Sequence, residues 1–401
     1  MRIAYLTARY PFPPIGGDRV RVYYTLRHML RSHEVTLYTL ASAPKERWQT
    51  HHPDLPGLEQ KSFQITKAAF AWNSAAAFFS NLPLQVKLYQ CPKLAQQLSS
   101  DIRSGAFDLL FVHLIRMAEF ARPFKAIPRI LDMTDSIHLH YTRMRRFSLT
   151  FQGLAALIER TRLQRYESAV CSWFDHVLLA SPLDLAWLHR NSSEPNLVLF
   201  PTGIEASAFP IHEGDFDPNR IIFVGKLDYL PNTDAAIYFA REILPLVRRA
   251  VPKAEFVVAG WNPPSAVRKL ERDPSVRVLP NVPDLRTEVA QSSVSVAPMR
   301  FGSGIQVKIL ESLALGTPAV ATESVIGAFG EEGKEAILVG RNPDEFAEKV
   351  VSILQDSATR ERLRRLGRRL IERRFQWHQV LAPLDRILEG IAEKRLEARQ
   401  C

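Results

Sequence analysis

The sequence predicts an α/β protein made of two tandem domains, each with an open parallel sheet. The chain has 401 residues, which suits two domains that each bury a core. It opens with an apolar strand, a loop, a helix and a second strand, and the same order begins again at residue 220. A break dense in Pro, Asp and Gly, at 209–220, separates the two patterns. Buried strands that alternate with helices indicate a sheet covered on both faces.

The first half supplies continuous apolar runs, of which "RIAYLTA" (2–8) is rich in strand-forming residues. A Pro/Gly loop follows it and leads into a helical pattern from about Asp18 to Ser32. The further strands expected in this half are 34–40, 108–113, 128–133 and 176–181, and the further helices are 92–104 and 151–171.

The second half repeats the pattern, starting with "RIIFVGKLDYLPNTDAAIYFAREILPLV", which predicts a strand, a loop and a helix. The later strands expected here are 254–260, 276–280, 294–298 and 318–322. An amphipathic helix closes the chain, and periodicity alone predicts only that it packs on the second domain. In open α/β sheets ligands bind outside the carboxyl ends of the strands, so two such ends that face each other would form a cleft.

Composition limits the class of protein. Apolar residues make up 46% and charged residues 23%, as in soluble globular proteins. The net charge of +10 favours anionic partners such as nucleotides, phospholipid surfaces or nucleic acid. Cys91, Cys171 and Cys401 are far apart, which indicates neither a disulfide framework nor a zinc site and fits a reducing cytoplasm. The apolar stretch from Ala68 is too short and too interrupted to span a bilayer.

The segment "PMRFGSGIQVKILESLALGTPAVAT" (298–322) carries the chemistry. A strand ends at Pro298, and Gly302 and Gly304 let the backbone approach a ligand closely. A helix is expected from near Ile305 to Leu315–Gly316. This places a helix N-terminus at a strand's carboxyl end, where free amides and the helix dipole favour an anion such as phosphate.

Lys308 and Glu311 lie three positions apart, on one face of that helix. A lysine can neutralise a diphosphate, and a carboxylate can accept hydrogen bonds from ribose hydroxyls. Together they indicate a sugar-bearing nucleotide. The alternative is an ordinary solvated helix face.

Other nucleotide and hydrolase signatures are missing. "GSGIQV" lacks the third glycine of the dinucleotide fingerprint, and "VGKLD" has no Ser or Thr after Lys226. "FGSGI" is not the GxSxG nucleophile elbow. An NAD enzyme, a P-loop NTPase and an α/β-hydrolase therefore each lack their main signature. "DFD" (215–217) precedes a strand, and we interpret it as structural rather than as a metal-chelating pair.

The segment resembles the nucleotide-sugar signature of family 4 glycosyltransferases, which are retaining enzymes of the GT-B fold. That signature has two glutamates eight positions apart and then A-x-G-x-P-V. The matching residues are Glu311, Ser312, Ala314, Gly316, Pro318 and Val320. Ser303 stands where the family has its first glutamate, which contacts the transferred sugar, so backbone amides of the glycine loop would have to replace that contact. "RFGSGIQVKILE" is similar to a subgroup of bacterial cell-surface and exopolysaccharide sugar transferases.

The resemblance covers nearly the whole chain and implies three parts. These are an acceptor-side Rossmann-like domain at 1–207, a nucleotide-sugar-binding Rossmann-like domain at 208–376, and a C-terminal helix at 377–401 that returns to the first domain. It implies catalytic roles for His113, Lys226, Lys308 and Glu311. The donor-binding residues that it implies are Gly16, Gly17, Gly225, Gly302, Ser303, Gly304 and Ile305.

Within this set, His113 would contact the donor sugar and Lys226 the diphosphate. The family's usual second cation is absent, since Asn232 holds its place, and Lys308 is our candidate replacement. Each assignment has a structural alternative: the Gly16–Gly17 pair can serve a turn, and His113 can be a core histidine.

The acceptor side is less defined. Asp132, Asp135 and Arg143 are candidates because they follow or end a predicted strand or lie in a basic cluster. That cluster, at 141–170, combines arginines with Phe147 and Phe151 and suits an anionic membrane surface. The alternative is a packed helix with a solvated cationic face. No nucleic-acid-binding module accompanies these charges, so nucleic acid is not expected as a partner.

The sequence therefore predicts a hexosyltransferase that uses a nucleotide diphosphate sugar, a lipid-linked or glycan acceptor and no cofactor, with no metal required. Fixed cations would offset the leaving-group charge. We expect it in the cytoplasm, peripheral to the inner face of the membrane. The alternatives are a GT-B nucleotide-sugar epimerase and a non-catalytic protein that binds nucleotide sugars or another anionic ligand.

Overall fold

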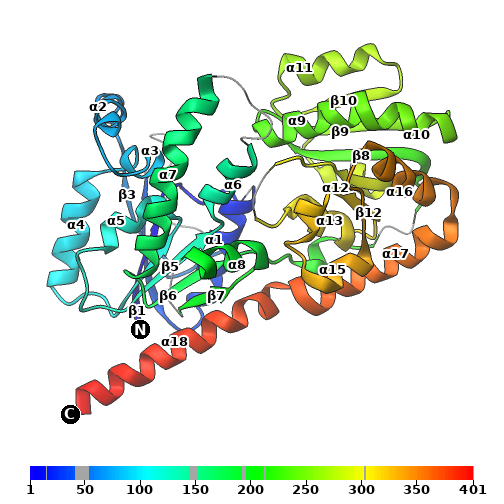
Figure 1. Cartoon of the computed structure of the whole chain (residues 1–401). Coiled ribbons are helices and arrows are strands. Elements are labelled where there is room, and N and C mark those ends of the chain that lie inside the picture. The colour runs from blue at the N-terminus through cyan, green and yellow to red at the C-terminus, as the bar shows by residue number, and fades with distance from the viewer. Residues whose placement is uncertain are drawn as a thin grey trace. The chain divides into compact units, whose positions relative to one another are not determined.

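Figure 1 shows a computed structural model of the protein. The structure describes residues 1–14, 16–40, 54–144, 151–191, 196–211, 214–301 and 304–400. The chain divides into two compact units. Unit 1 comprises Met1–Pro201 together with Leu381–Cys401, and unit 2 comprises Thr202–Val380. Helix α18 (Trp377–Gln400) therefore begins in unit 2 and belongs to unit 1 from Leu381 onward.

Unit 1 is built on a parallel sheet with the strand order β3-β2-β1-β4-β5-β6-β7. Its strands are β1 (Arg2–Thr7), β2 (Glu34–Leu40), β3 (Glu59–Phe63), β4 (Leu109–His113), β5 (Arg129–Thr134), β6 (His176–Leu179) and β7 (Leu197–Leu199). Its helices before α18 are α1 (Gly17–Met29), α2 (Lys67–Phe78), α3 (Leu84–Lys87), α4 (Pro92–Arg103), α5 (Ala118–Ala121), α6 (Ile137–Met144), α7 (Phe151–Cys171) and α8 (Pro182–Asn191).

Unit 2 repeats this topology with the strand order β10-β9-β8-β11-β12-β13, again parallel. Its strands are β8 (Asp217–Lys226), β9 (Glu255–Trp261), β10 (Val276–Pro280), β11 (Ser292–Ala297), β12 (Ala319–Ala321) and β13 (Ile337–Val339). Its helices are α9 (Leu230–Tyr238), α10 (Leu244–Ala250), α11 (Ser265–Arg268), α12 (Leu285–Ala290), α13 (Val307–Ala314), α14 (Glu323–Ile326), α15 (Gly330–Ala336), α16 (Pro343–Gln355) and α17 (Ser357–Leu370).

The central strands of both sheets are buried on two faces, and β1, β4 and β8 each contain an uninterrupted apolar run. Successive residues of β8 belong to different cores: Phe223 packs with α9, α10 and α16, whereas Ile222 and Val224 pack with α12. Such strands need no alternation of polar and apolar residues. This confirms the expected α/β class with two parallel sheets.

The strand order reverses at the centre of each sheet, between β1 and β4 in unit 1 and between β8 and β11 in unit 2. The carboxyl ends of these central strands are where an open α/β sheet binds its ligand. The Gly16–Gly17 loop follows β1 and His113 ends β4, while Lys226 ends β8 and the glycine loop follows β11. The candidate residues thus fall at the reversal point of each unit.

The sheets contain three short strands that the sequence patterns did not predict, β3, β7 and β13. β3 reads "EQKSF" and lacks an apolar run, so only its pairing with β2 makes it a strand. β8 also starts at Asp217, inside the stretch expected as a break, because Asp217 pairs with Ser292 of β11. Among the described residues, no helix has the length and apolar character needed to cross a membrane.

Candidate functional site

The end of β8 in unit 2 is shaped by close backbone contacts. A Cβ atom on Gly260 would lie 1.8 Å from the carbonyl oxygen of Gly225 on the neighbouring strand. A Cβ on Gly225 would lie 2.9 Å from Nδ2 of Asn232 and 3.2 Å from Nζ of Lys308. Glycine at 225 therefore leaves room for two polar side chains directly beside the strand end.

Asn232 joins α9, β8 and α13 through its side-chain amide. Its Nδ2 donates to the carbonyl oxygen of Lys226 at 2.9 Å, and its Oδ1 accepts from Nζ of Lys308 at 2.7 Å. In the family that the sequence resembles, a lysine is usual at the position of Asn232. In the structure the ammonium group of Lys308, which comes from another helix, lies beside the Asn232 side chain.

Lys308 is buried, with 9% of its surface exposed, so it does not lie on a solvated helix face. Its Nζ lies 4.1 Å from the centroid of the Phe223 ring. Burial lowers the pKa of Lys308 to about 7, and the negative charge of Glu311 only partly opposes that shift. The site thus holds a cation that the surrounding protein atoms stabilise poorly.

Glu311 lies one turn further along α13 and is half-buried. Burial raises its pKa to about 7, although Lys308 and Arg286 act in the opposite direction. Arg286 of α12 is itself held by Asp284, with Nε to Oδ1 at 2.9 Å. Perturbed titrating groups beside a strand end are typical of binding and catalytic sites.

Lys226 differs from Lys308, because 68% of its side chain is exposed. Its Nζ lies 3.5 Å from a carboxylate oxygen of Asp228. The loop after β11 is anchored on α9 by an ion pair between Arg300 and Asp234, with Nε to Oδ2 at 2.9 Å. Lys226 is therefore a solvated cation at the same edge of the sheet as the buried Lys308.

The glycine loop is described only in part. Gly302 and Ser303 lie outside the described residues. Gly304 has a φ of +68°, a left-handed conformation that favours glycine, and Ile305 is 9% exposed. Helix α13 begins at Val307, two residues later than expected, with Gln306 at its N-cap.

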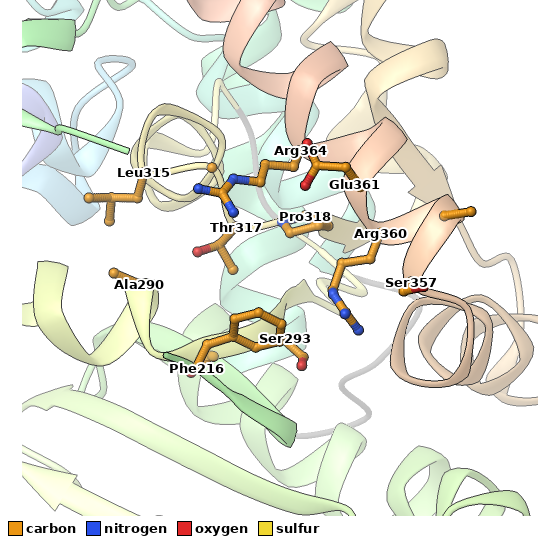
Figure 2. Close-up of a pocket in the computed structure, with 13 residues that line it drawn as sticks. Phe216, Ala290, Ser293, Leu315, Thr317, Pro318, Ser357, Arg360, Glu361 and Arg364 are labelled. Carbon is orange, nitrogen blue, oxygen red and sulfur yellow. The ribbon is translucent and has the colours of Figure 1, made fainter. Parts of the chain in front are cut away.

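A cavity of about 420 Å³ lies elsewhere in unit 2 (Figure 2). It is lined by the start of β11, the C-terminal end of α13 and the first turns of α17, including Ser293, Thr317, Arg360 and Arg364. This is the amino edge of the sheet, opposite the strand ends that carry Gly225 and Lys226. The cavity is therefore not part of the candidate site.

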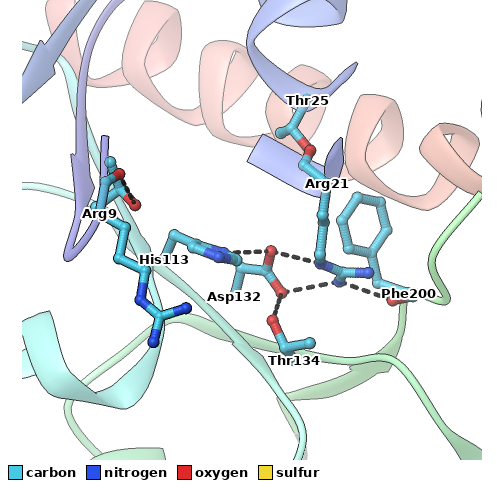
Figure 3. A network of polar contacts seen from close by, with 8 residues as sticks. Arg9, Arg21, Thr25, His113, Asp132, Thr134 and Phe200 are labelled. Atoms are coloured by element: carbon cyan, nitrogen blue, oxygen red, sulfur yellow. Dashed lines mark hydrogen bonds and ion pairs between the residues drawn. The ribbon is translucent and has the colours of Figure 1, made fainter. Parts of the chain in front are cut away.

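Unit 1 holds a buried ionic network at its own strand ends (Figure 3). Arg21 of α1 binds Asp132 of β5 in two places, Nε to Oδ2 at 2.7 Å and Nη2 to Oδ1 at 2.8 Å. Nη2 of Arg21 also donates to the carbonyl oxygen of Phe200 at 2.8 Å, and the guanidinium lies 4.4 Å from that ring's centroid. Both charged side chains are at most 1% exposed.

His113 of β4 joins this network, with Nδ1 3.0 Å from Oδ2 of Asp132 on the adjacent strand. Burial would raise the pKa of Asp132, but Arg21 and His113 outweigh it and hold that pKa well below its usual range. The ionised carboxylate accepts a hydrogen bond from Nδ1–H. In the neutral ring, Nε2 then keeps its lone pair.

Within the part of the chain that the structure describes, Nε2 of His113 is buried and has no hydrogen-bond partner. His113 lines a narrow pocket together with Thr7 at the end of β1, Arg9 of the following loop and Asp18 of α1. Arg9 and Asp18 form an ion pair there at 2.9 Å. The neutral ring would offer Nε2 as a hydrogen-bond acceptor whose orientation is fixed by Asp132.

Backbone strain marks the same place. Leu114 directly follows His113, Thr134 lies two residues after Asp132, and both have a φ of +69°. Positive φ is rare for residues other than glycine, especially for a β-branched one. Such conformations cluster at functional sites, where surrounding contacts hold them.

Comparison with known proteins identifies the fold. Residues 218–356, most of unit 2, match the family model described as Glycosyl transferases group 1. Sucrose-phosphate synthase from Thermosynechococcus elongatus superimposes with a TM-score of 0.76 at 17% identity, covering 98% of this chain and 100% of that one. The chain has the GT-B fold.

Two further structures share this GT-B fold. HepE of Anabaena, solved in complex with UDP and glucose, gives a TM-score of 0.68 at 11% identity and covers 97% of this chain and 100% of that one. An E. coli trehalose-6-phosphate protein bound with UDP-2-fluoro glucose gives 0.67 at 14%, covering 96% and 98%. The comparison with curated proteins gave no match.

The remaining sequence-predicted residues of this GT-B chain divide into three groups. Gly16 and Gly17 are exposed at the start of α1, and Gly16 has a φ of +94°. Asp135 follows β5 and is half-buried. Arg143 lies in α6, but its side chain is outside the described part of the structure, as are the neighbouring residues 145–150 of the basic cluster.

Sequence reasoning missed the roles of Arg21 and Asn232 in this GT-B protein. Arg21 reads as one of several arginines on a polar helix, and only its pairing with a residue 111 positions away reveals its burial. At Asn232 the sequence indicates only that the lysine usual in the similar family is absent. In the described ranges, no group of three or more His, Cys, Asp or Glu residues is placed to hold a metal ion.

Proposed function

We propose that the protein is a retaining hexosyltransferase that uses a nucleotide diphosphate sugar. The family match over residues 218–356 supports transfer of a glycosyl group. The observation that carries the donor assignment is the buried ammonium of Lys308, 2.7 Å from Asn232 beside the end of β8. A diphosphate with two negative charges at this strand end would supply the counter-charge for the Lys308 ammonium group.

In this proposal the cations of unit 2 stabilise the leaving group. Lys308 acts from beneath the strand end and Lys226 from the solvent side, and the N-terminal amides of α13 add donors for a phosphate oxygen. Negative charge grows on the diphosphate as the glycosidic bond breaks, and fixed donors stabilise it without reorganising. No metal is required for this step, because both lysines supply positive charge.

Glu311 and His113 would bind the sugars of the donor. The carboxylate of Glu311 accepts hydrogen bonds from the ribose hydroxyls, and Nε2 of His113 accepts one from a hydroxyl of the hexose. Gly16, Gly17 and Gly304 let the backbone approach the diphosphate and the sugar. Because Ser303 replaces the glutamate of the related family, backbone amides of its loop take over that contact.

Retention follows in this proposal if the acceptor hydroxyl attacks from the face that the diphosphate leaves. The new C–O bond then forms as the anomeric carbon separates from the diphosphate oxygen, and that oxygen takes the hydroxyl proton. The complexes of HepE with UDP and of the E. coli protein with UDP-2-fluoro glucose support testing uridine nucleotides first.

We infer that the acceptor is a lipid-linked or glycan hydroxyl in cell-surface polysaccharide synthesis. The excess of 52 basic over 42 acidic residues supports a partner with negative charge, such as a lipid diphosphate or an anionic membrane. The protein would then work in the cytoplasm, peripheral to the inner face of the membrane.

A thermal-shift panel of nucleotide sugars tests the donor assignment. A ligand that binds only the folded state raises the unfolding temperature, so one or more nucleotide sugars should stabilise the wild type. Glu311→Ala should lose most of that shift. Glu348→Ala, an exposed glutamate on α16, is the matched control and should keep it.

A panel without any response would contradict the donor site. Transfer of labelled sugar to an acceptor extract separates the proposed activity from its alternatives. Epimerised or free sugar without an acceptor product would instead support a GT-B nucleotide-sugar epimerase, and binding without turnover would support a non-catalytic protein.

A further inference from the structure

Helix α2 of unit 1 (Lys67–Phe78) has its apolar side chains on the outside. Ala68, Trp72, Ala75 and Phe79 repeat at helical spacing, and all four are exposed. The exposed fraction is 74% for Trp72 and 96% for Phe79, which directly follows the helix. Residues at this spacing form one stripe along a helix, and such a stripe normally faces the core.

The side of α2 that faces unit 1 is, in contrast, partly polar. Asn73 is buried, and its Nδ2 donates to the carbonyl oxygens of Leu88 at 3.3 Å and Gln90 at 3.0 Å. Ala77 is the other buried side chain described in this helix. The helix is therefore anchored through an amide and exposes the rings of Phe70 and Trp72.

Neighbouring residues extend the apolar surface. Phe70 is 50% exposed, and Leu84, at the start of α3, is 40% exposed. α3 packs against α2, and the two lie side by side in Figure 1. Exposed aromatic clusters of this kind are rare on soluble proteins and mark sites of interaction. We name Ala68, Phe70, Trp72, Ala75, Phe79 and Leu84 the α2 surface.

Charge identifies the occupant of this surface. Between Glu59 and Asp101 the sequence has no acidic residue but four lysines. Lys67 is exposed at the first position of α2, and Lys87 ends α3. An apolar face flanked by lysines, with Trp and Phe at its centre, suits the boundary between anionic headgroups and acyl chains.

We propose that the α2 surface inserts into the headgroup layer of an anionic lipid bilayer. Trp72 and Phe79 enter the boundary of the acyl chains, while Lys67 and Lys87 contact the anionic headgroups. The surface itself does not depend on the donor assignment. It rests on the proposed function only in that membrane docking would bring a lipid-linked acceptor to unit 1.

Vesicle sedimentation of the full chain tests this proposal without any donor. Wild type should sediment with phosphatidylcholine–phosphatidylglycerol vesicles and much less with phosphatidylcholine alone. The double variant Trp72→Ser/Phe79→Ser should weaken binding by about tenfold or more, because it lacks the two aromatic side chains that pass from water into the bilayer. Trp261→Ser removes an exposed tryptophan of unit 2, 45% exposed, and should bind as wild type does.

Two further measurements keep the test specific. Lys67→Glu should reduce binding to the phosphatidylglycerol vesicles, and its unfolding temperature should stay at the wild-type value because Lys67 is exposed. Brominated lipid should quench tryptophan fluorescence in wild type but less in Trp72→Phe. Lys308→Met should sediment with vesicles as wild type does, which separates membrane docking from donor binding.

Several results would overturn the proposal. These are no vesicle binding by wild type, undiminished binding by the double variant, or an equal loss in Trp261→Ser. A wild-type dimer that the double variant cannot form, seen by sedimentation velocity without vesicle binding, would instead assign the α2 surface to a second copy of the chain.

Discussion

The two units each hold buried charge at the reversal point of a parallel sheet, but they compensate it differently. In unit 1, Arg21 and Asp132 form a two-point ion pair, and the carbonyl of Phe200 and the ring of His113 complete it. In unit 2, the hydrogen bond described for Lys308 goes to the neutral amide of Asn232. In unit 1 the buried charges form an ion pair with each other, whereas Lys308 has no such ion pair among the described residues.

The difference explains why the charged form is favoured for Asp132 in unit 1 and disfavoured for Lys308 and Glu311 in unit 2. The pKa of Asp132 is held low because its charge has strong partners, whereas burial lowers the pKa of Lys308 and raises that of Glu311 towards 7. A fully paired ion fixes geometry, here the ring of His113. A poorly paired ion gains most from an incoming opposite charge, so we expect binding energy to come mainly from unit 2.

Breaking the ion pair in unit 1 should have the largest effect. Asp132→Asn leaves the buried guanidinium of Arg21 without its counter-charge and should destabilise the protein by about 3–5 kcal/mol. Urea unfolding followed by circular dichroism measures this loss. Asp228→Asn, at a half-exposed carboxylate, is the matched control and should change stability little. A loss as small as the control's would show that the pair is not a structural requirement.

Lys308→Met should separate stability from function. Removing a poorly stabilised buried cation should leave the unfolding midpoint near or above the wild-type value. Transfer should fall by about 2.7–4 kcal/mol of transition-state stabilisation, the scale for losing one fixed electrostatic donor. kcat/KM with a responding nucleotide sugar measures it, and Lys334→Met, an exposed lysine of α15, should match wild type. Unchanged kcat/KM would remove Lys308 from the mechanism.

Affinity for a nucleotide diphosphate sugar should fall as pH rises above about 7. The diphosphate binds protonated Lys308, whose pKa in the free protein is lowered to about 7. Above that pH Lys308 must first take up a proton, which raises the dissociation constant by up to about tenfold per pH unit, less the gain from ionising Glu311, whose pKa is raised to about 7. Calorimetry across the range checks this. A wild-type profile as flat as that of Lys308→Met would contradict it.

Lys226→Ala should have the smallest effect on stability, within about 0.5 kcal/mol, because the side chain is solvated. Nucleotide-sugar affinity should still weaken, since the diphosphate loses a cation. Chemical unfolding and binding by the same variant give both values. Lost stability with unchanged affinity would show that Lys226 stabilises the fold and does not bind the diphosphate.

Much of the fold was predictable from local patterns. The runs "RIAYLTA" and "RIIFVGK" each contain four or more consecutive apolar residues, which is typical of strands buried on both faces, and both form central strands. β3 was not predicted because "EQKSF" has no such run and depends on β2 for its hydrogen bonds. Gly16 and His113 were candidates because of the family resemblance, and the adjacency of β1 and β4 in the structure puts both at one sheet edge.

The sequence by itself determined two parallel sheets, their strand ends, and the presence of Lys308 and Glu311 on one helix, because these follow from residue periodicity over short distances. Only the tertiary structure decided that Lys308 is buried against Asn232, that Arg21 neutralises Asp132, and that α2 turns its aromatic stripe outward. Each of these depends on contacts between segments distant in the chain, which set burial and charge compensation and which no local pattern encodes.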